Sequence, residues 1–267
     1  MRVRPPAVAG FFYPSDPNQL KTMVTGFLDQ AQKTITPDDT AGLRAMIVPH
    51  AGYVYSGSTA ALGYALLKML ADKVKHIVLV GPTHRVGIRG IALPDADAMA
   101  TPLGEVPLWT DGARLALAQQ WVVPSAEVHA QEHSLEVQLP FLQEVVPHAD
   151  VLPLAAGWVE PQAVTDVINT VWADDVFVVI SSDLSHYHPY AEAKSIDEGT
   201  VAQILAGEQV DHDQACGATG IDALILSAST QHLTPRLIGM CNSGDTAGDK
   251  FQVVGYATLG FYAEDLS

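Results

Sequence analysis

Basic residues, cysteines and long hydrophobic runs are all scarce in this sequence. The chain has 14 Lys and Arg against 30 Asp and Glu, and its net charge of −16 repels nucleic acid and other polyanions. Two cysteines, Cys216 and Cys241, are too few for a disulfide framework, so each is a free thiol, a core residue or a metal ligand. No run approaches the roughly 18 apolar residues of a membrane span. Prolines interrupt the N-terminal segment, which therefore does not resemble a secretory signal, and we expect a cytoplasmic protein.

The hydrophobic residues that are present, 48% of 267, suffice for a sizeable core and fall in short runs. No internal repeat or domain-sized linker interrupts the chain, so we expect a single domain over residues 1–267. Short runs rich in Val, Ile and Leu predict buried strands, and longer runs with helical periodicity lie between them. This alternation favours a layered α/β fold with a mostly parallel or mixed central sheet flanked by helices.

The predicted strands are residues 45–48, 76–80, 89–93, 151–154, 176–180 and 251–255. The predicted helices are residues 20–32, 58–70, 135–145, 161–171, 191–205 and 221–229. We also expect a loop at 36–42, a hairpin or irregular excursion over 101–109, and a final C-terminal strand that closes the sheet.

Histidines follow three of the predicted strands. His50 follows the strand AMIV, His84 follows HIVLV, and His186 follows VFVVI. A single histidine after a strand is usually a surface loop residue. Three at equivalent strand ends are more informative, because open α/β sheets bind their ligands beyond the carboxyl ends of the strands. The sequence therefore predicts a shared site at one edge of the sheet.

The segment QEHSLE offers a fourth candidate histidine. Ser134 suits the cap of the following helix, and Glu136 suits its first turn, where the helix dipole favours a carboxylate. His133 is equally compatible with this structural role and with a place in the pocket. Its neighbour Glu132 is suited to support a pocket imidazole.

Cys216 precedes another predicted helix, a position at which the pKa of a thiol is lowered. Free cysteine also packs as a small hydrophobic residue, so a core role stands beside a metal-binding one. Two imidazoles and one thiolate can bind one face of Zn, Cu or Fe and leave positions open for water or substrate. Cys241, within the strand-like RLIGMCN, is assigned to the core.

Seven motifs resemble one protein family in their order along the chain. They are PAVAGFFYPSDP, VPHAGYVYSG, GPTHR, EHSLEVQLPFL, SSDLSHY, ACGATGIDAL and NSGDTAGDKFQVVGYAT, extending from about Pro6 to Phe261. Together they make the chain similar to the Memo-like family, which includes protein B of the bacterial AmmeMemoRadiSam system. The resemblance implies the fold of the class III extradiol dioxygenases, in which two histidines and one carboxylate hold non-haem Fe(II).

Carried over motif by motif, the resemblance implies three metal ligands: His50, His84 and Cys216. It also implies three acid/base residues: His133, Asp183 and His186. Cys216 is the departure from the dioxygenases, which have a carboxylate there. Because a thiolate is softer, it shifts the metal preference toward copper, zinc or a more electron-rich iron.

The leading hypothesis is a dioxygenase-like, metal-dependent oxidoreductase that uses iron or copper on a small organic substrate. In it, His186 is the general base, Asp183 assists His186, and His133 donates a proton or stabilises an oxyanion. A second hypothesis is a non-catalytic accessory protein with a vestigial pocket, working with the radical-SAM and AMMECR-type partner proteins that the resemblance implies. A third is zinc-dependent hydrolysis, for which two His, one Cys and an activated water suffice.

Overall fold

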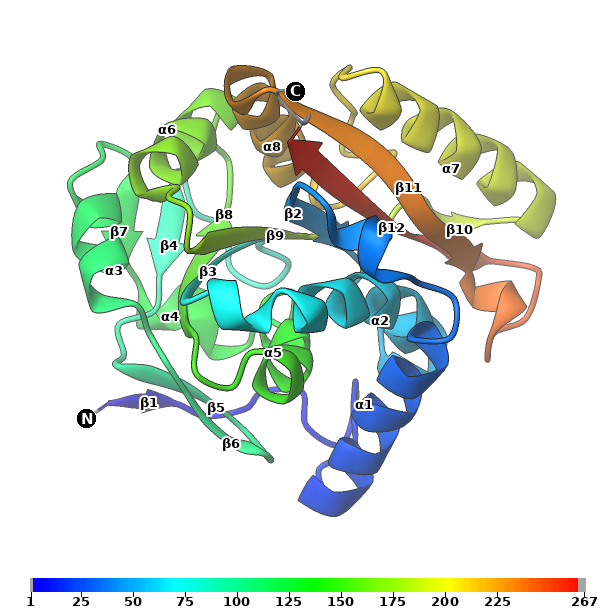
Figure 1. The fold of residues 1–267 in the computed structure, drawn as a ribbon, viewed down its shortest axis with the longest axis horizontal. Coiled ribbons are helices and arrows are strands. Elements are labelled where there is room, and N and C mark those ends of the chain that lie inside the picture. The colour runs from blue at the N-terminus through cyan, green and yellow to red at the C-terminus, as the bar shows by residue number, and fades with distance from the viewer. Residues whose placement is uncertain (1, 264–267) are drawn as a thin grey trace.

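The computed structural model describes residues 2–263, and within them nine strands form a mixed central sheet (Figure 1). Its strand order is β10–β12–β2–β9–β3–β8–β4–β7, and β11 also pairs with β12. The strands are β2 (Leu43–Val48), β3 (His76–Pro82), β4 (Ile91–Leu93), β7 (Val122–Pro124), β8 (Asp150–Ala156), β9 (Val176–Ser181), β10 (His186–His188), β11 (Leu233–Asn242) and β12 (Val253–Ala263). The predicted α/β class with a mixed sheet is confirmed.

The centre of the sheet is parallel and buried on both faces. Strands β2, β9, β3 and β8 run parallel, whereas β12 is antiparallel to β2 and β4 is antiparallel to β8. Alternate residues of β3 enter two separate cores, Ile77 and Leu79 on one face and Val78 and Val80 on the other. Strands buried on both faces read as continuous hydrophobic runs, which is why the sequence located them well.

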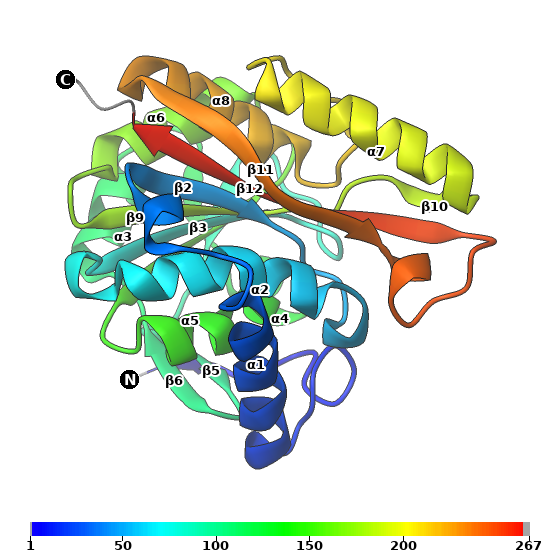
Figure 2. The same ribbon diagram turned by 45° about the vertical axis from the view of Figure 1, so that its right-hand side comes forward.

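Helices cover both faces of the sheet (Figure 1). The helices α1 (Pro17–Ala31), α2 (Tyr53–Met69) and α5 (Leu139–Val145) pack together on one face. On the other face lie α3 (Thr110–Leu117), α6 (Pro161–Val171) and α8 (Ala218–Gln231), with α7 (Tyr190–Leu205) beside β11 and β12 (Figure 2). The remaining helix is α4 (Ala126–Ala130). No helix in the described part of the chain is long and apolar enough to cross a membrane.

A small second sheet contains the hairpin expected over 101–109. Its strands are β1 (Val3–Arg4), β5 (Ala98–Thr101) and β6 (Gly104–Pro107). The antiparallel pair β5–β6 turns at Thr101 and Gly104, and β1 adds to β5 in parallel. The hairpin therefore begins three residues before the expected range.

Several predicted boundaries are wrong for identifiable reasons. The predicted helix over 135–145 is divided into a short 3-10 helix (Glu136–Gln138) and α5, with Pro140 in the first turn of α5. The predicted strand 89–93 is too long at its N-terminal side. Gly90 has a φ of 126°, which is not a strand conformation, so β4 begins at Ile91. The C-terminal strand does not close the sheet, because β12 lies between β2 on one side and β10 and β11 on the other (Figure 2).

Glu136 lies in the first turn of the 3-10 helix Glu136–Gln138, as expected, and its carboxylate also holds the N-terminal segment. Its fully buried carboxylate accepts hydrogen bonds from the amides of Ala7 at 2.8 Å and Val8 at 3.0 Å and from the Tyr13 hydroxyl at 2.5 Å, and it forms an ion pair with Arg4. Phe12 lies in the segment that these contacts hold, and its ring packs against that of His133 with centroids 4.5 Å apart. Glu136 thus joins the N-terminal loop to the wall of the pocket.

Replacing Glu136 by Gln should strongly destabilise the fold, because it leaves the buried Arg4 guanidinium without its charged partner. We expect a loss of about 3–5 kcal/mol in the free energy of unfolding, measured by urea denaturation. Glu144→Gln is the matched control, since Glu144 pairs with the exposed Lys21 at 3.8 Å and such pairs contribute about 1 kcal/mol or less. Equal losses in the two variants would refute the anchoring role.

Candidate metal centre

The carboxyl ends of β2 and β3 bring two histidines together. Both strands run parallel to β9, and His50 and His84 each lie two residues beyond their strand. Their imidazole rings meet edge to face with centroids 5.2 Å apart. The sequence prediction that strand ends deliver these histidines to one place is confirmed by the geometry.

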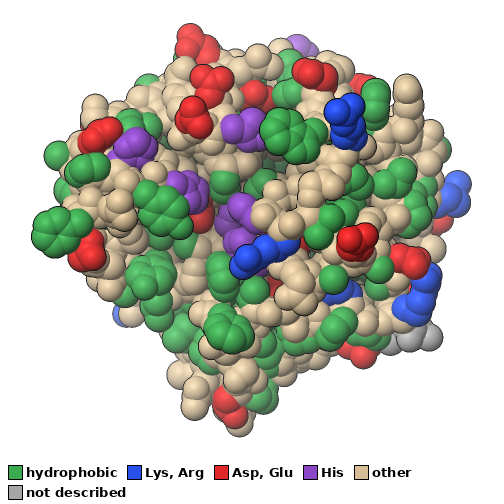
Figure 3. Space-filling model, turned by 180° about the vertical axis from the view of Figure 1, so that it is seen from behind, with side chains coloured by type: hydrophobic (Ala, Val, Ile, Leu, Met, Phe, Trp, Pro, Cys, Tyr) green, Lys and Arg blue, Asp and Glu red, His purple; other side chains and the backbone are tan. Residues whose placement is uncertain are grey.

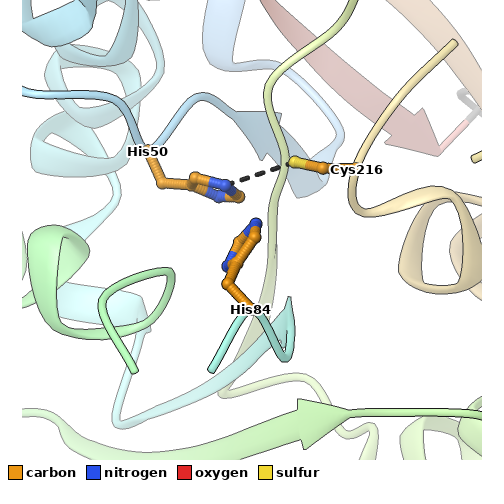
Figure 4. Close-up of side chains that lie close together, drawn as sticks. All are labelled: His50, His84 and Cys216. Carbon is orange, nitrogen blue, oxygen red and sulfur yellow. Dashed lines mark hydrogen bonds between the residues drawn. The ribbon is translucent and has the colours of Figure 1, made fainter. Parts of the chain in front are cut away.

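Cys216 completes this group, and Figure 4 shows its side chain pointing toward those of His50 and His84. It lies just before α8, with Gly217 as the N-cap, and its Sγ is 3.2 Å from Nε2 of His50. The donor atoms of His50, His84 and Cys216 all lie within 4.8 Å of one another. Tetrahedral ligands at about 2.0–2.3 Å from an ion are roughly 3.3–3.8 Å from one another, a separation inside this limit. The three side chains therefore fit a metal ion in both donor type and arrangement.

Glu132 orients the second of these histidines. Its Oε1 lies 2.9 Å from His84 Nδ1 and accepts hydrogen bonds from the amides of His133 and Ser134, each at 2.9 Å. Burial alone would raise the pKa of Glu132, but the hydrogen bonds from His84 and the amides hold it well below its usual range. An ionised carboxylate only accepts, so Nδ1 of His84 carries the proton and Nε2 keeps its lone pair for a metal.

A second group of donors, His84, Glu132 and His133, also lies within 4.8 Å. Glu132 is already committed, because its two oxygens accept from the backbone and imidazole of His84 and from two further amides. A carboxylate whose lone pairs are occupied by N–H groups is a weak metal ligand. The group is better explained as the support of His84 than as a second ion site.

His133 lies beside the two donor histidines. Its ring centroid is 4.6 Å from that of His84 and 5.5 Å from that of His50. Burial lowers its pKa to about 4, so the imidazole is neutral at pH 7. Its Nδ1 is 3.4 Å from Glu132 Oε1 yet has no hydrogen-bond partner. The structure therefore places His133 next to His50 and His84, and its role in a pocket stays a prediction. Ser134 likewise does not cap a helix, because its hydroxyl donates to the carbonyl of Pro82 at 2.8 Å.

Asp183 and His186 do not form the pair that we expected. Asp183 Oδ1 accepts the backbone N–H of His50 at 2.7 Å, and burial raises its pKa to about 7. The His186 imidazole instead hydrogen-bonds to the carbonyl of Leu184, and burial lowers its pKa. Asp183 therefore fixes the loop that carries His50. The two residues lie three positions apart in sequence, and the chain between them turns toward β10.

The pKa of Cys216 is the opposite of the sequence expectation. Burial, together with the Asp183 carboxylate, raises the pKa of the thiol to about 12. Helix α8 begins two residues later, and the low-dielectric surroundings outweigh its dipole. A bound metal ion deprotonates a coordinating thiol, so binding here would release the Cys216 proton.

A cavity of about 970 Å³ reaches this group. Of the donor group, Cys216 lines it, together with Thr83, Thr219 and the exposed Trp121 and Trp158. Figure 3 shows histidines gathered in a hollow of this face, with hydrophobic side chains around them. The volume is in the range of small-molecule sites. The structure is that of an α/β protein with a cavity at the carboxyl ends of its parallel strands, where such folds bind their ligands.

Comparisons with known proteins identify the family of the chain. The family model described as "Memo-like protein" matches residues 4–260. A "MEMO1 family protein" of Aquifex aeolicus is 35% identical, covering 98% of this chain and all of the relative. Proteins of the same name from Aeropyrum pernix and Archaeoglobus fulgidus are 34% and 33% identical, each over 97% of this chain and 99% of the relative. The chain belongs to the Memo family.

Some contributors to the site left little trace in the sequence. Phe12 lies more than 100 residues from His133, and Gln138 occupies what reads as an ordinary helical position. Ser181 is the last residue of β9 and would pass as a strand end, yet it contacts His50. Only the density of polar residues in SSDLSH gave a signal.

The raised pKa of Asp183 predicts a pH-dependent stability of the metal-free protein. The unfolded carboxyl ionises near 3.8 and the folded one near 7, so rising pH between these values destabilises the parent. Asp183→Asn is isosteric, keeps an acceptor for the His50 amide and does not titrate. Between pH 4 and pH 8, we expect the free energy of unfolding of the parent to fall by roughly 4 kcal/mol relative to that of the variant. A difference independent of pH, in urea titrations across this range, would contradict the assignment.

Proposed function

We propose that this protein is a metal-dependent oxidoreductase that holds iron or copper through His50, His84 and Cys216 and acts on a small organic substrate. The observation that carries the proposal is the convergence of two imidazole nitrogens and one thiol beside a cavity of about 970 Å³. One imidazole, His84, already has its other nitrogen occupied by a carboxylate, an arrangement found at many metal ligands.

The donor set bears on the choice of metal. Two imidazoles and a soft thiolate suit copper, zinc or an electron-rich iron better than the harder cations. When bound, iron or copper would supply one-electron redox chemistry. The cysteine in place of a carboxylate separates this site from the ring-cleaving dioxygenases, so the reaction is proposed at the level of oxidoreductase and not of ring cleavage.

His133 and His186 would handle protons on the substrate. His133 is neutral at pH 7 and its Nδ1 is unpartnered, so it can exchange a hydrogen bond with a bound molecule. His186 has a lowered pKa and is also neutral, as a general base requires. Asp183 accepts the hydrogen bond of the His50 amide and would act by holding the loop that carries His50. Its carboxyl group would gain or lose a proton near pH 7.

Metal binding tests the proposal through Cys216. Loading the metal-free protein anaerobically with Fe(II) or Cu should give one tightly bound ion per chain, followed by absorption and EPR spectra. In Cys216→Ala, affinity should fall by more than the 10–100-fold typical of losing a residue that only supports a ligand. Cys241→Ala is the control: Cys241 is a half-buried thiol that bonds Thr59 at 3.0 Å, away from the donor group.

Stoichiometry decides this experiment, because a chain of net charge −16 attracts cations weakly at many places. Unchanged stoichiometric affinity in Cys216→Ala would mean that the ligand set is wrong. Oxygen consumption with a catechol-type probe by the loaded parent would support the enzyme. Activity that arises only after addition of a radical-SAM partner would favour the accessory role instead.

A further inference from the structure

We propose that Ser181 and Gln138 are positioning residues that fix the tautomer of His50, so that its Nε2 lone pair faces Cys216 and the metal position. The role of these two residues in metal binding rests on the proposed function. The proton positions themselves follow from hydrogen bonds within the chain. Two backbone carbonyl groups, which can only accept hydrogen bonds, determine these positions.

The Pro49 carbonyl fixes the orientation of the Gln138 amide. Nε2 of Gln138 lies 2.9 Å from the Pro49 oxygen, and the reversed amide would set two acceptors against each other there. At its other end, Gln138 Oε1 accepts the hydroxyl of Tyr64 from α2 at 2.8 Å. The second N–H of Gln138 therefore donates to Ser181 Oγ, which is 2.8 Å away.

The Ser134 carbonyl fixes the proton of Ser181. Ser181 Oγ lies 2.6 Å from this carbonyl oxygen, which must receive the single hydroxyl proton. Ser181 Oγ can then only accept hydrogen bonds: one comes from Gln138, and a second can come from another donor. Its third neighbour is Nδ1 of His50, at 3.0 Å.

It follows that Nδ1 of His50 carries a proton and donates it to Ser181. In a neutral imidazole the other nitrogen then holds the lone pair, and Nε2 of His50 is the atom that lies 3.2 Å from Cys216 Sγ. Gln138, Ser181 and His50 are each at most 2% exposed, so water does not compete for these hydrogen bonds. The two imidazoles are thus oriented by different means, His84 by an ionised carboxylate and His50 by a neutral hydroxyl.

The first test needs no metal, and a substitution serves only to assign the signals. Long-range ¹H–¹⁵N spectra of the metal-free, ¹⁵N-histidine-labelled parent at neutral pH distinguish protonated from unprotonated ring nitrogens. His50 is assigned by the signal lost in a His50→Gln variant. We expect His50 as a single tautomer with the proton on Nδ1.

Substitution of Ser181 then tests its role. Ser181→Ala leaves the buried Nδ1–H without an acceptor, so His50 should move to the Nε2–H tautomer or a mixture. Affinity for Zn²⁺, measured by competition with a chromogenic chelator, should fall 10–100-fold. Ser181→Thr keeps a hydroxyl and should retain both the parent tautomer and most of the affinity.

Ser227→Ala is the matched control for losing a buried serine. Ser227 lies in α8, is fully buried and has no hydrogen-bond partner for its hydroxyl. Its variant should match the parent in tautomer and Zn²⁺ affinity, which separates loss of the Ser181 contact from general loosening of the core.

A parent His50 that is protonated on Nε2 would overturn the inference, as would a Ser181→Ala variant with the parent's tautomer and affinity. A parent that binds no Zn²⁺ stoichiometrically would instead count against the proposed function. The nitrogen spectra would still decide the tautomer, so the two failures are distinguishable.

Discussion

The parallel pairing of β2, β9 and β3 is the constraint on which the rest of this site depends. Because the three strands run in one direction, their carboxyl ends release His50, Ser181 and His84 at one edge of the sheet. His50, Ser181 and His84 therefore meet without a long loop between strand and side chain. The buried hydrophobic faces of the same strands hold this edge in place, so the geometry of the pocket is set by the core beneath it.

Buried carboxylates then organise the loops above that edge, each with a different outcome. Glu132 is supplied with enough N–H donors to stay ionised, and it fixes His84. Asp183 has fewer donors, so burial dominates and its pKa rises to about 7 while it holds the His50 amide. Glu136 takes no part in the donor group and ties the N-terminal loop to the pocket wall. For Glu132 and Asp183, the number of donors facing the carboxylate decides its charge and thereby its role.

Periodicity and strand-end position were enough to predict the α/β class, most of the central strands and the meeting of His50 with His84. Cys216 needed the family resemblance, because the residues alone left it as a free thiol, a core residue or a metal ligand. The contacts of Ser181 with Gln138 and of Glu136 with Val8 join residues 43 and 128 positions apart, which no local pattern encodes. The expected Asp183–His186 pair and the expected low pKa of Cys216 failed because burial and chain direction, not sequence proximity, determine them.

The central claim is that His50, His84 and Cys216 hold a redox metal. Anomalous diffraction from crystals of the protein, recorded across the Fe, Cu and Zn absorption edges, tests it most directly. We predict one strong peak at about 2.0–2.3 Å from His50 Nε2, His84 Nε2 and Cys216 Sγ, with its absorption edge at iron or copper. A peak with only the zinc edge, or ions found only among surface carboxylates, would contradict the account.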